Sequence, residues 1–186
     1  PGSISSFNAE AHRADFQVVS ADQIYNADTE TMQHLVETMI ADFQQQMEED
    51  KDRHLLPAVE LKPLFQNWQK TADCFLQDYQ QGAQQERYID VVKPRWPFVA
   101  HQFDIALCSD IDFSQHQQLH ISPLDVIQEL VRISKEVRIF PLLNLAGEIA
   151  PEWGEVMHWL QENHFGQEIK MISYHQLKGQ NAMLRI

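Results

Sequence analysis

Apolar residues follow two different spacings along this chain. Short runs rich in branched and aromatic residues are typical of strands, whereas apolar residues three or four apart are typical of helices. Strand-like runs lie at residues 15–25, 87–92, 103–109, 136–143, 168–175 and 181–186. Helical patterns lie at residues 5–13, 28–53, 123–134 and 151–164. A further helical pattern follows Pro57 and Pro63 and ends at Gly82. The pattern predicts an α/β protein.

Helices that alternate with strands predict βαβ units, a mainly parallel sheet and helices on both of its faces. The last two strands are separated only by "QLKGQ", which is too short for a crossover helix. We therefore expect an antiparallel final pair. A crossover between two strands needs only one helix, so we interpret the two helices at about residues 28–82 as an insertion that forms a lid. The whole chain, residues 1–186, is predicted to be a single domain.

The charge of the chain narrows the choice of partners. The 186 residues include 14 Lys and Arg against 27 Asp and Glu, a formal net charge of -13. Neutralising phosphates requires a basic surface, so this balance argues against binding to nucleic acid or to an anionic membrane. The 44% of apolar residues are sufficient for a globular core.

Cys74 and Cys108 are the two cysteines, and they do not form a CxxC pair. This predicts a reducing, cytoplasmic location and no zinc cluster. His116 and His120 stand four residues apart in "SQHQQLHIS", which is typical of a loop. We interpret them as solvated histidines and expect no metal site. There is no apolar run of bilayer length and no signal peptide pattern, so we expect no membrane segment.

Acidic residues follow several of the predicted strands. Asp22 comes after the first strand, Asp90 lies near the end of 87–92, and Ser109, Asp110 and Asp112 end 103–109. Ligands of open parallel sheets bind beyond the carboxyl ends of strands, and a carboxylate about 20 residues after a glycine turn accepts hydrogen bonds from ribose.

Each of these acidic residues also has a simpler interpretation. Asp22 can be a turn or cap residue, because aspartate is favoured there without a ligand. Asp90 can be a solvent-facing strand position. Asp110 and Asp112 are candidates for catalytic acids, and ordinary loop residues are the alternative.

Four blocks of the chain carry a family resemblance: "FQVVSADQIY", "WPFVAHQFDIALCS", "ELVRISKEVRIFPLLNLAGE" and "KGQNAMLRI". Together they resemble bacterial class I S-adenosylmethionine-dependent methyltransferase-like proteins, from about Ser6 to Ile186. The resemblance implies a Rossmann-like sheet, mostly parallel with an antiparallel last strand, and an S-adenosylmethionine cofactor. It also implies that the first strand and the upstream half of the glycine-rich loop are absent from this chain. An omitted segment, a strand from another chain or a remodelled domain would each account for that.

The resemblance also implies the placement of the cofactor. Its residues would be Gly2 in the remnant of the glycine loop, Asp22 at the ribose hydroxyls, Gln23 and Ile24 beside the adenosine, Asp90 and Val91 near the adenine, and Cys108 and Ser109 under the sulfonium. The implied activity is methyl transfer to a small-molecule or protein acceptor.

A non-catalytic protein-interaction module that has lost the cofactor is the rival hypothesis. A nucleotide-binding oxidoreductase fits the closing antiparallel pair less well. The sequence leaves a homodimer open.

Overall fold

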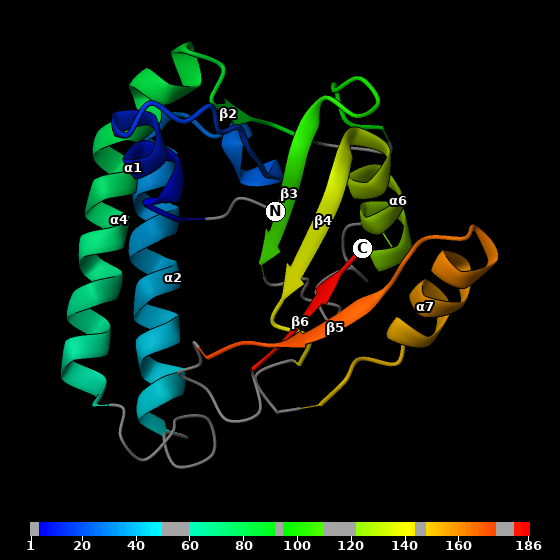
Figure 1. The fold of residues 1–186 in the computed structure, drawn as a ribbon. Coiled ribbons are helices and arrows are strands. Elements are labelled where there is room, and N and C mark those ends of the chain that lie inside the picture. Colours follow the sequence, from blue (N-terminus) through cyan, green and yellow to red (C-terminus); the bar gives the residue numbers. More distant parts are fainter. Residues whose placement is uncertain (1–3, 50–59, 92–94, 110–121, 144–147, 174–180) are drawn as a thin grey trace. The chain divides into compact units, whose positions relative to one another are not determined.

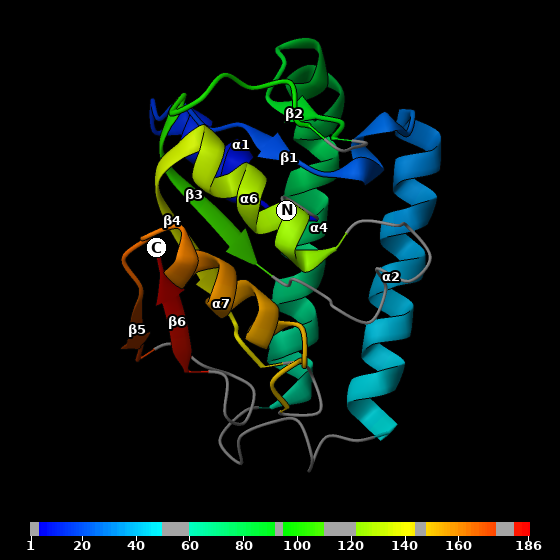
Figure 2. The ribbon, with the colours of Figure 1, turned by 90° about the vertical axis from the view of Figure 1, so that its right-hand side faces the viewer.

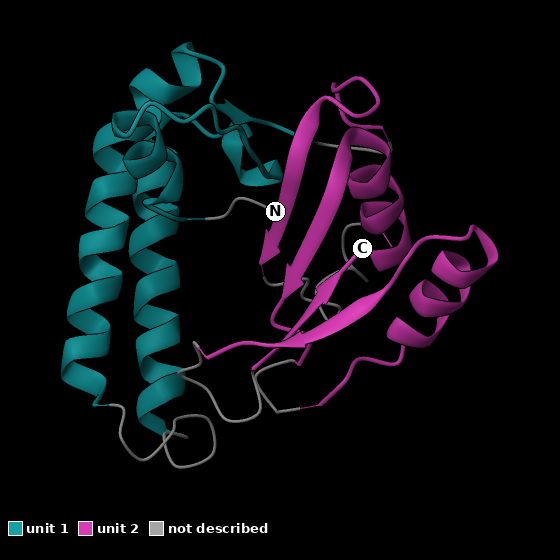
Figure 3. Cartoon of the chain, viewed as in Figure 1, with its two compact units in different colours: residues 1–92 teal, residues 93–186 magenta. Residues whose placement is uncertain are grey.

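The structure is a computed structural model that describes residues 4–49, 60–91, 95–109, 122–143, 148–173 and 181–186. The chain divides into two compact units, unit 1 (residues 1–92) and unit 2 (residues 93–186), which Figure 3 shows in different colours. The single domain with a helical insertion stays a prediction.

Unit 1 consists mainly of a pair of long helices (Figure 1). Its elements in chain order are α1 (Phe7–Arg13), β1 (Ser20–Ala21), the 3-10 helix η1 (Gln23–Asn26), α2 (Thr29–Glu49), α4 (Leu61–Gln84) and β2 (Tyr88–Ile89). Helix α2 begins where the Asp28 carboxylate accepts a hydrogen bond from the Thr31 N–H group at 2.8 Å, since such acceptors satisfy the unpaired donors of a first helical turn.

The core of unit 1 is an aromatic and aliphatic cluster between α2, α4, η1 and β2. Its buried members are Tyr25, Met32, Val36, Ala72, Phe75, Tyr79 and Tyr88. Gly82, inside α4, makes room for this cluster, because a Cβ atom there would lie 2.3 Å from the Tyr88 ring. The predicted helices at 28–53 and up to Gly82 are confirmed within the described residues.

The strands of unit 1 are shorter than the sequence pattern predicts. Strand β1 has two residues of the expected 15–25, and β2 has two of the expected 87–92. Phe16, a strand former in the pattern, is 68% exposed and precedes β1. Strands β1 and β2 pair in parallel, with Ser20 opposite Tyr88.

Unit 2 follows the predicted alternation closely. Its elements are β3 (Phe103–Ser109), α6 (Pro123–Ile133), β4 (Ser134–Phe140), α7 (Trp153–Glu162), β5 (Glu168–Met171) and β6 (Ala182–Arg185). Helix α6 begins with a capping box, in which Ser122 and Asp125 each accept the other's backbone N–H, and Pro123 occupies its first turn.

The four strands of unit 2 form one mixed sheet in the order β3-β4-β6-β5. Strands β3 and β4 are parallel, whereas β6 is antiparallel to both β4 and β5. The predicted antiparallel pairing of the last two strands is therefore confirmed.

The predicted Rossmann-like class I methyltransferase sheet is wrong. The structure has a two-stranded parallel sheet and a separate four-stranded mixed sheet instead of one mostly parallel sheet. Alternating strands and helices do not specify which strands share hydrogen bonds. In a single sheet, one strand would share backbone hydrogen bonds both with the two-stranded sheet and with the four-stranded sheet. None of the described strands does this.

Both helices of unit 2, α6 and α7, lie on the same face of its sheet (Figure 2), so the expected covering of both faces is also wrong for the described part. The core lies between these helices and the sheet, and it includes Cys108, Ile127, Ile139, Leu160 and Leu184. The opposite face carries the ion pairs of Glu136 with Arg138 and Arg185. No helix in the described part of the chain has the length and apolar character needed to cross a membrane.

Candidate functional site

The carboxyl ends of β1 and β2 bring two of the predicted site residues to one edge. Asp22 directly follows β1 and Asp90 directly follows β2. The Asp22 N–H group donates to the Ile89 carbonyl oxygen at 3.1 Å, so the parallel pairing continues past the two strands. One further residue in this register places Asp22 beside Asp90. We call these two residues and η1 the strand-tip site.

Asp22 has the local role that its sequence position suggested as the simpler alternative. It is the N-cap of η1, and its Oδ1 atom accepts a hydrogen bond from the Ile24 N–H group at 3.2 Å. The residue is 9% exposed, whereas Asp90 is exposed. The cap fixes the direction of the carboxylate.

The other strand-tip residues of the prediction have mixed surroundings. Gln23 and Ile24 are half-buried on η1, and Val91 is buried at 7% exposure. The five residues predicted near the adenosine all belong to unit 1, and they are Asp22, Gln23, Ile24, Asp90 and Val91.

The aromatic cluster of unit 1 packs against η1, which is part of the strand-tip site. The Tyr79 hydroxyl donates to the carbonyl oxygens of Tyr25 and Ala27 at 3.2 and 2.8 Å, which ties the end of η1 to α4. Burial raises the pKa of Tyr25, and the negative charge of Asp22 raises it further. Burial also raises the pKa of Tyr79, with added contributions from Asp28 and Asp90.

These tyrosines are therefore neutral hydrogen-bonding groups at physiological pH. The charge at the site comes from carboxylates, which accept hydrogen bonds from hydroxyl groups and attract cations. Among the described residues, no group of three or more His, Cys, Asp and Glu side chains is arranged to hold a metal ion.

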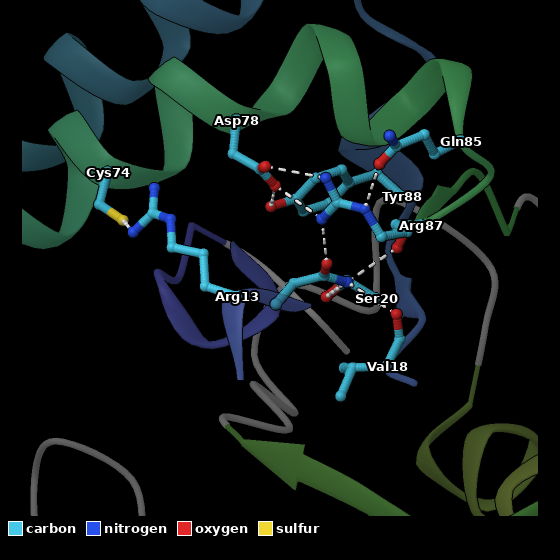
Figure 4. A network of polar contacts seen from close by, with 9 residues as sticks. Arg13, Val18, Ser20, Cys74, Asp78, Gln85, Arg87 and Tyr88 are labelled. Atoms are coloured by element: carbon cyan, nitrogen blue, oxygen red, sulfur yellow. Dashed lines mark hydrogen bonds and ion pairs between the residues drawn. The ribbon is translucent and has the colours of Figure 1, made fainter. Parts of the chain in front are cut away.

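A buried polar network holds β1 and β2 in place (Figure 4). The Arg87 guanidinium binds Asp78 through two hydrogen bonds, Nη1 to Oδ2 at 2.7 Å and Nη2 to Oδ1 at 2.8 Å. Nη1 also donates to Asn8 Oδ1 at 2.6 Å, and Nε donates to Gln85 at 2.9 Å. Asn8 in turn donates to the Arg87 carbonyl, the Val18 carbonyl and the Ser20 hydroxyl.

This network joins α1, α4 and both strands next to the strand-tip site, and sequence reasoning missed it. Asn8 and Arg87 are 79 positions apart, so no local spacing relates them. The one available signal was an arginine at the start of an apolar strand. Such a residue is expensive to bury without a partner.

The Arg87–Asp78 pair makes stability depend on pH in a defined direction. Hydrogen bonds from Arg87 hold the pKa of Asp78 below its ordinary value of 3.8. A lowered carboxyl pKa stabilises the folded state above the unfolded pKa, and this stabilisation is lost as pH falls through the folded value. We expect the difference in unfolding free energy between wild type and Asp78→Asn to be constant from pH 7 to about pH 4 and to shrink below it. Urea denaturation at each pH measures it. A difference that grows in acid would contradict this assignment.

Cys108 and Ser109, predicted under the sulfonium, belong to unit 2. Cys108 is 2% exposed, within the core cluster against α6 and α7, and Ser109 is the exposed last residue of β3. Gly2, Asp110, Asp112, His116 and His120 lie outside the described residues.

Two surface depressions lie elsewhere. One of about 330 Å³ is between α2 and α4, lined partly by Gln33, Val36 and Ile40. The other, of about 370 Å³, adjoins Glu168 and Arg185. Neither is lined by a predicted site residue.

The fold and the strand-tip site together define an α/β protein with paired carboxylates at the end of a short parallel sheet. No family model and no solved structure matches the chain. The chain is similar to the uncharacterized protein MJ0045 of Methanocaldococcus jannaschii, with 29% identity over 191 residues. The match covers 98% of this chain and 81% of that protein.

Proposed function

We propose that the protein binds S-adenosylmethionine at the strand-tip site and transfers its methyl group to a small-molecule or protein acceptor. The observation that carries the proposal is the position of Asp22 and Asp90 beside each other at the carboxyl ends of two parallel strands. The resemblance of the sequence blocks to S-adenosylmethionine-dependent methyltransferase-like proteins supports it. The proposal concerns this site and does not depend on a larger sheet.

The residues of the site suit this ligand chemically. Carboxylates accept hydrogen bonds from ribose hydroxyls, and the Asp22 carboxylate is held at the strand end by the N–H group of Ile24. The apolar side chains of Ile24 and Val91 suit an adenine ring. Two carboxylates also favour a cationic sulfonium over a phosphate-bearing nucleotide, because like charges repel.

S-adenosylmethionine supplies a methyl group that is already activated, so the protein has to hold the donor and the acceptor in line and exclude water. In this proposal, Asp22 and Asp90 hold the nucleoside and neither transfers a proton. Gly2, Cys108 and Ser109 stay predictions for the methionine end, and Asp110 and Asp112 stay candidates for contact with the acceptor. Cys74 and Cys108 are both thiols, which supports a cytoplasmic location.

Isothermal titration with S-adenosylmethionine, and with its demethylated product, tests the proposal on the full-length product of the natural gene. We expect heat with both ligands and none with NAD. Absence of heat with both adenosyl ligands would end the methyltransferase hypothesis.

Replacement of Asp22 tests the strand-tip site itself. We expect Asp22→Ala to weaken S-adenosylmethionine binding at least tenfold, about 1.4 kcal/mol, because a charged acceptor for the ribose is lost. Asp22→Asn keeps an acceptor for the Ile24 N–H group. If this variant loses as much affinity as Asp22→Ala, the loss is due to the missing charge. Asp42→Ala, at an exposed position of α2, serves as the control and should bind normally. Unchanged affinity in both Asp22 variants would remove Asp22 from the site.

A non-catalytic interaction module is the second candidate. It is favoured by the division of the strands into two separate sheets, since a nucleoside site on a parallel sheet usually uses several adjacent strand ends. The titration distinguishes the two functions, because the module binds neither adenosyl ligand.

A further inference from the structure

Asn8 is a polar side chain buried within unit 1. It lies on α1 and is 1% exposed, so its polar atoms need hydrogen-bond partners. The Nδ2 atom of this amide donates to the Arg87 carbonyl oxygen at 2.9 Å, the Ser20 Oγ atom at 3.1 Å and the Val18 carbonyl oxygen at 3.2 Å. Its Oδ1 atom accepts from Arg87 Nη1 at 2.6 Å. With three acceptors for two N–H groups, the amide is fully engaged as a donor.

These contacts reach both strands of the two-stranded sheet at the same level. Ser20 is the first residue of β1, and Arg87 directly precedes β2. The Arg87 carbonyl oxygen also accepts from the Ser20 N–H group at 2.8 Å, which joins the two strands at this end. Asn8 therefore binds both partners of that hydrogen bond from α1, an element outside the sheet.

The strand pair has few means of its own to define its register. Strands β1 and β2 have two residues each, so few backbone hydrogen bonds hold them together. Register depends on side-chain contacts, and a slip of one residue turns the side chains of a strand to the other face. The observed register has Ser20 opposite Tyr88, and one that differs from it would move Asp22 away from Asp90.

We propose that Asn8 is a positioning residue of the strand-tip site. By holding Ser20 to Arg87, it selects the register of β1 and β2 in which the two carboxylates of the site lie beside each other. Asn8 acts through the strands, from a contact two residues upstream of Asp22. The consequence for S-adenosylmethionine rests on the proposed function, whereas the consequence for the register does not.

The Ser20 side chain extends this role toward η1. Burial raises the pKa of Tyr25, and a hydrogen bond with the Ser20 side chain opposes this increase. Tyr25 belongs to η1, whose N-cap is Asp22. The contacts therefore run from Asn8 through Ser20 to the helix that begins at the Asp22 carboxylate.

Hydrogen exchange of the ligand-free, full-length protein tests the effect on the register. Asn8→Leu keeps the approximate size of the side chain and removes its polar atoms. The Asp22 amide donates to Ile89, and we expect it to exchange at least tenfold faster in this variant than in the wild type. Asp78→Asn is the matched control, because it weakens the same network at the Arg87 guanidinium and keeps the Asn8 side chain. The Asp22 amide should exchange there at the wild-type rate. Equal acceleration in both variants would show a purely structural role and overturn the proposal.

Replacement of Ser20 gives a milder second test. Ser20→Ala removes the hydroxyl that Asn8 binds on β1, and Ser20→Thr keeps a hydroxyl at that position. We expect faster exchange of the Asp22 amide in Ser20→Ala and a rate close to that of the wild type in Ser20→Thr. If Asn8→Leu does not fold, the Ser20 pair decides, and a wild-type rate in Ser20→Ala overturns the proposal.

Isothermal titration separates this inference from the proposed function. Asn8→Leu should bind S-adenosylmethionine at least tenfold more weakly than the wild type, and Asp78→Asn should bind it normally. A wild type that binds the ligand together with an Asn8→Leu variant that binds it equally well overturns the positioning role. A wild type that binds no adenosyl ligand overturns the proposed function, and the exchange rates then decide by themselves whether Asn8 sets the register.

Discussion

Replacing Arg87 with methionine is expected to lower the free energy of unfolding by about 3 kcal/mol. The side chains of Arg87 and Asp78 are only 10% and 13% exposed, so the substitution leaves a carboxylate nearly buried without its cation. Asn8 and Gln85 lose donors at the same time. Uncompensated buried charge costs more than the pair itself contributes, which explains the size of the effect.

Urea denaturation followed by circular dichroism measures this loss. The matched control is Lys135→Met, because Lys135 and its partner Asp104 are 64% and 87% exposed. A solvated pair of this kind is worth at most about 1 kcal/mol. Equal losses in the two variants would show that the Arg87 network is solvated and does not organise unit 1.

Replacing Phe75 with alanine is expected to cost about 3–5 kcal/mol, the range for aromatic side chains removed from a packed core. The Phe75 side chain is 0% exposed. Its ring centroid lies 5.3 Å from that of Tyr79, 5.5 Å from that of Tyr88 and 6.2 Å from that of Tyr25. The cavity left by alanine would lie among rings that are held by α4, β2 and η1, so it cannot close freely.

Phe16 provides the control for this second substitution. It is the same residue type in the same unit but is 68% exposed, so Phe16→Ala should change stability by no more than about 0.5 kcal/mol. Chemical denaturation of both variants under the same conditions makes the comparison. A loss below about 1 kcal/mol for Phe75→Ala would mean that the aromatic cluster is not the core of unit 1.

Helices α2, α4, α6 and α7 were predictable from sequence because their determinants are local. The spacing of Met32 and Val36 marks the buried side of α2, and Ser122 with Asp125 marks the beginning of α6. Strand β3 was predictable as a nearly continuous apolar run, and the brevity of the last connection predicted the antiparallel end of the sheet.

The candidate site was predictable only in part. Asp22 was identified because it follows a predicted strand and Asp90 because it lies near the end of another, and β1 and β2 do lie in parallel. The capping of η1 by Asp22 was one of two interpretations that the sequence could not separate. The Arg87 network had no local signature, since Asn8, Asp78 and Ser20 come from α1, α4 and the beginning of β1.

The sequence by itself determined the order and type of most elements, the acidic character of the chain and the residues at the strand ends. These follow from side-chain spacing and from hydrogen bonds between near neighbours. Only the tertiary structure decided that the strands divide into two sheets, that α6 and α7 share one face, and that Asn8, Asp78 and Arg87 meet. Strand pairing and buried ion pairs join residues far apart in the chain, and local patterns carry no information about which distant groups satisfy each other.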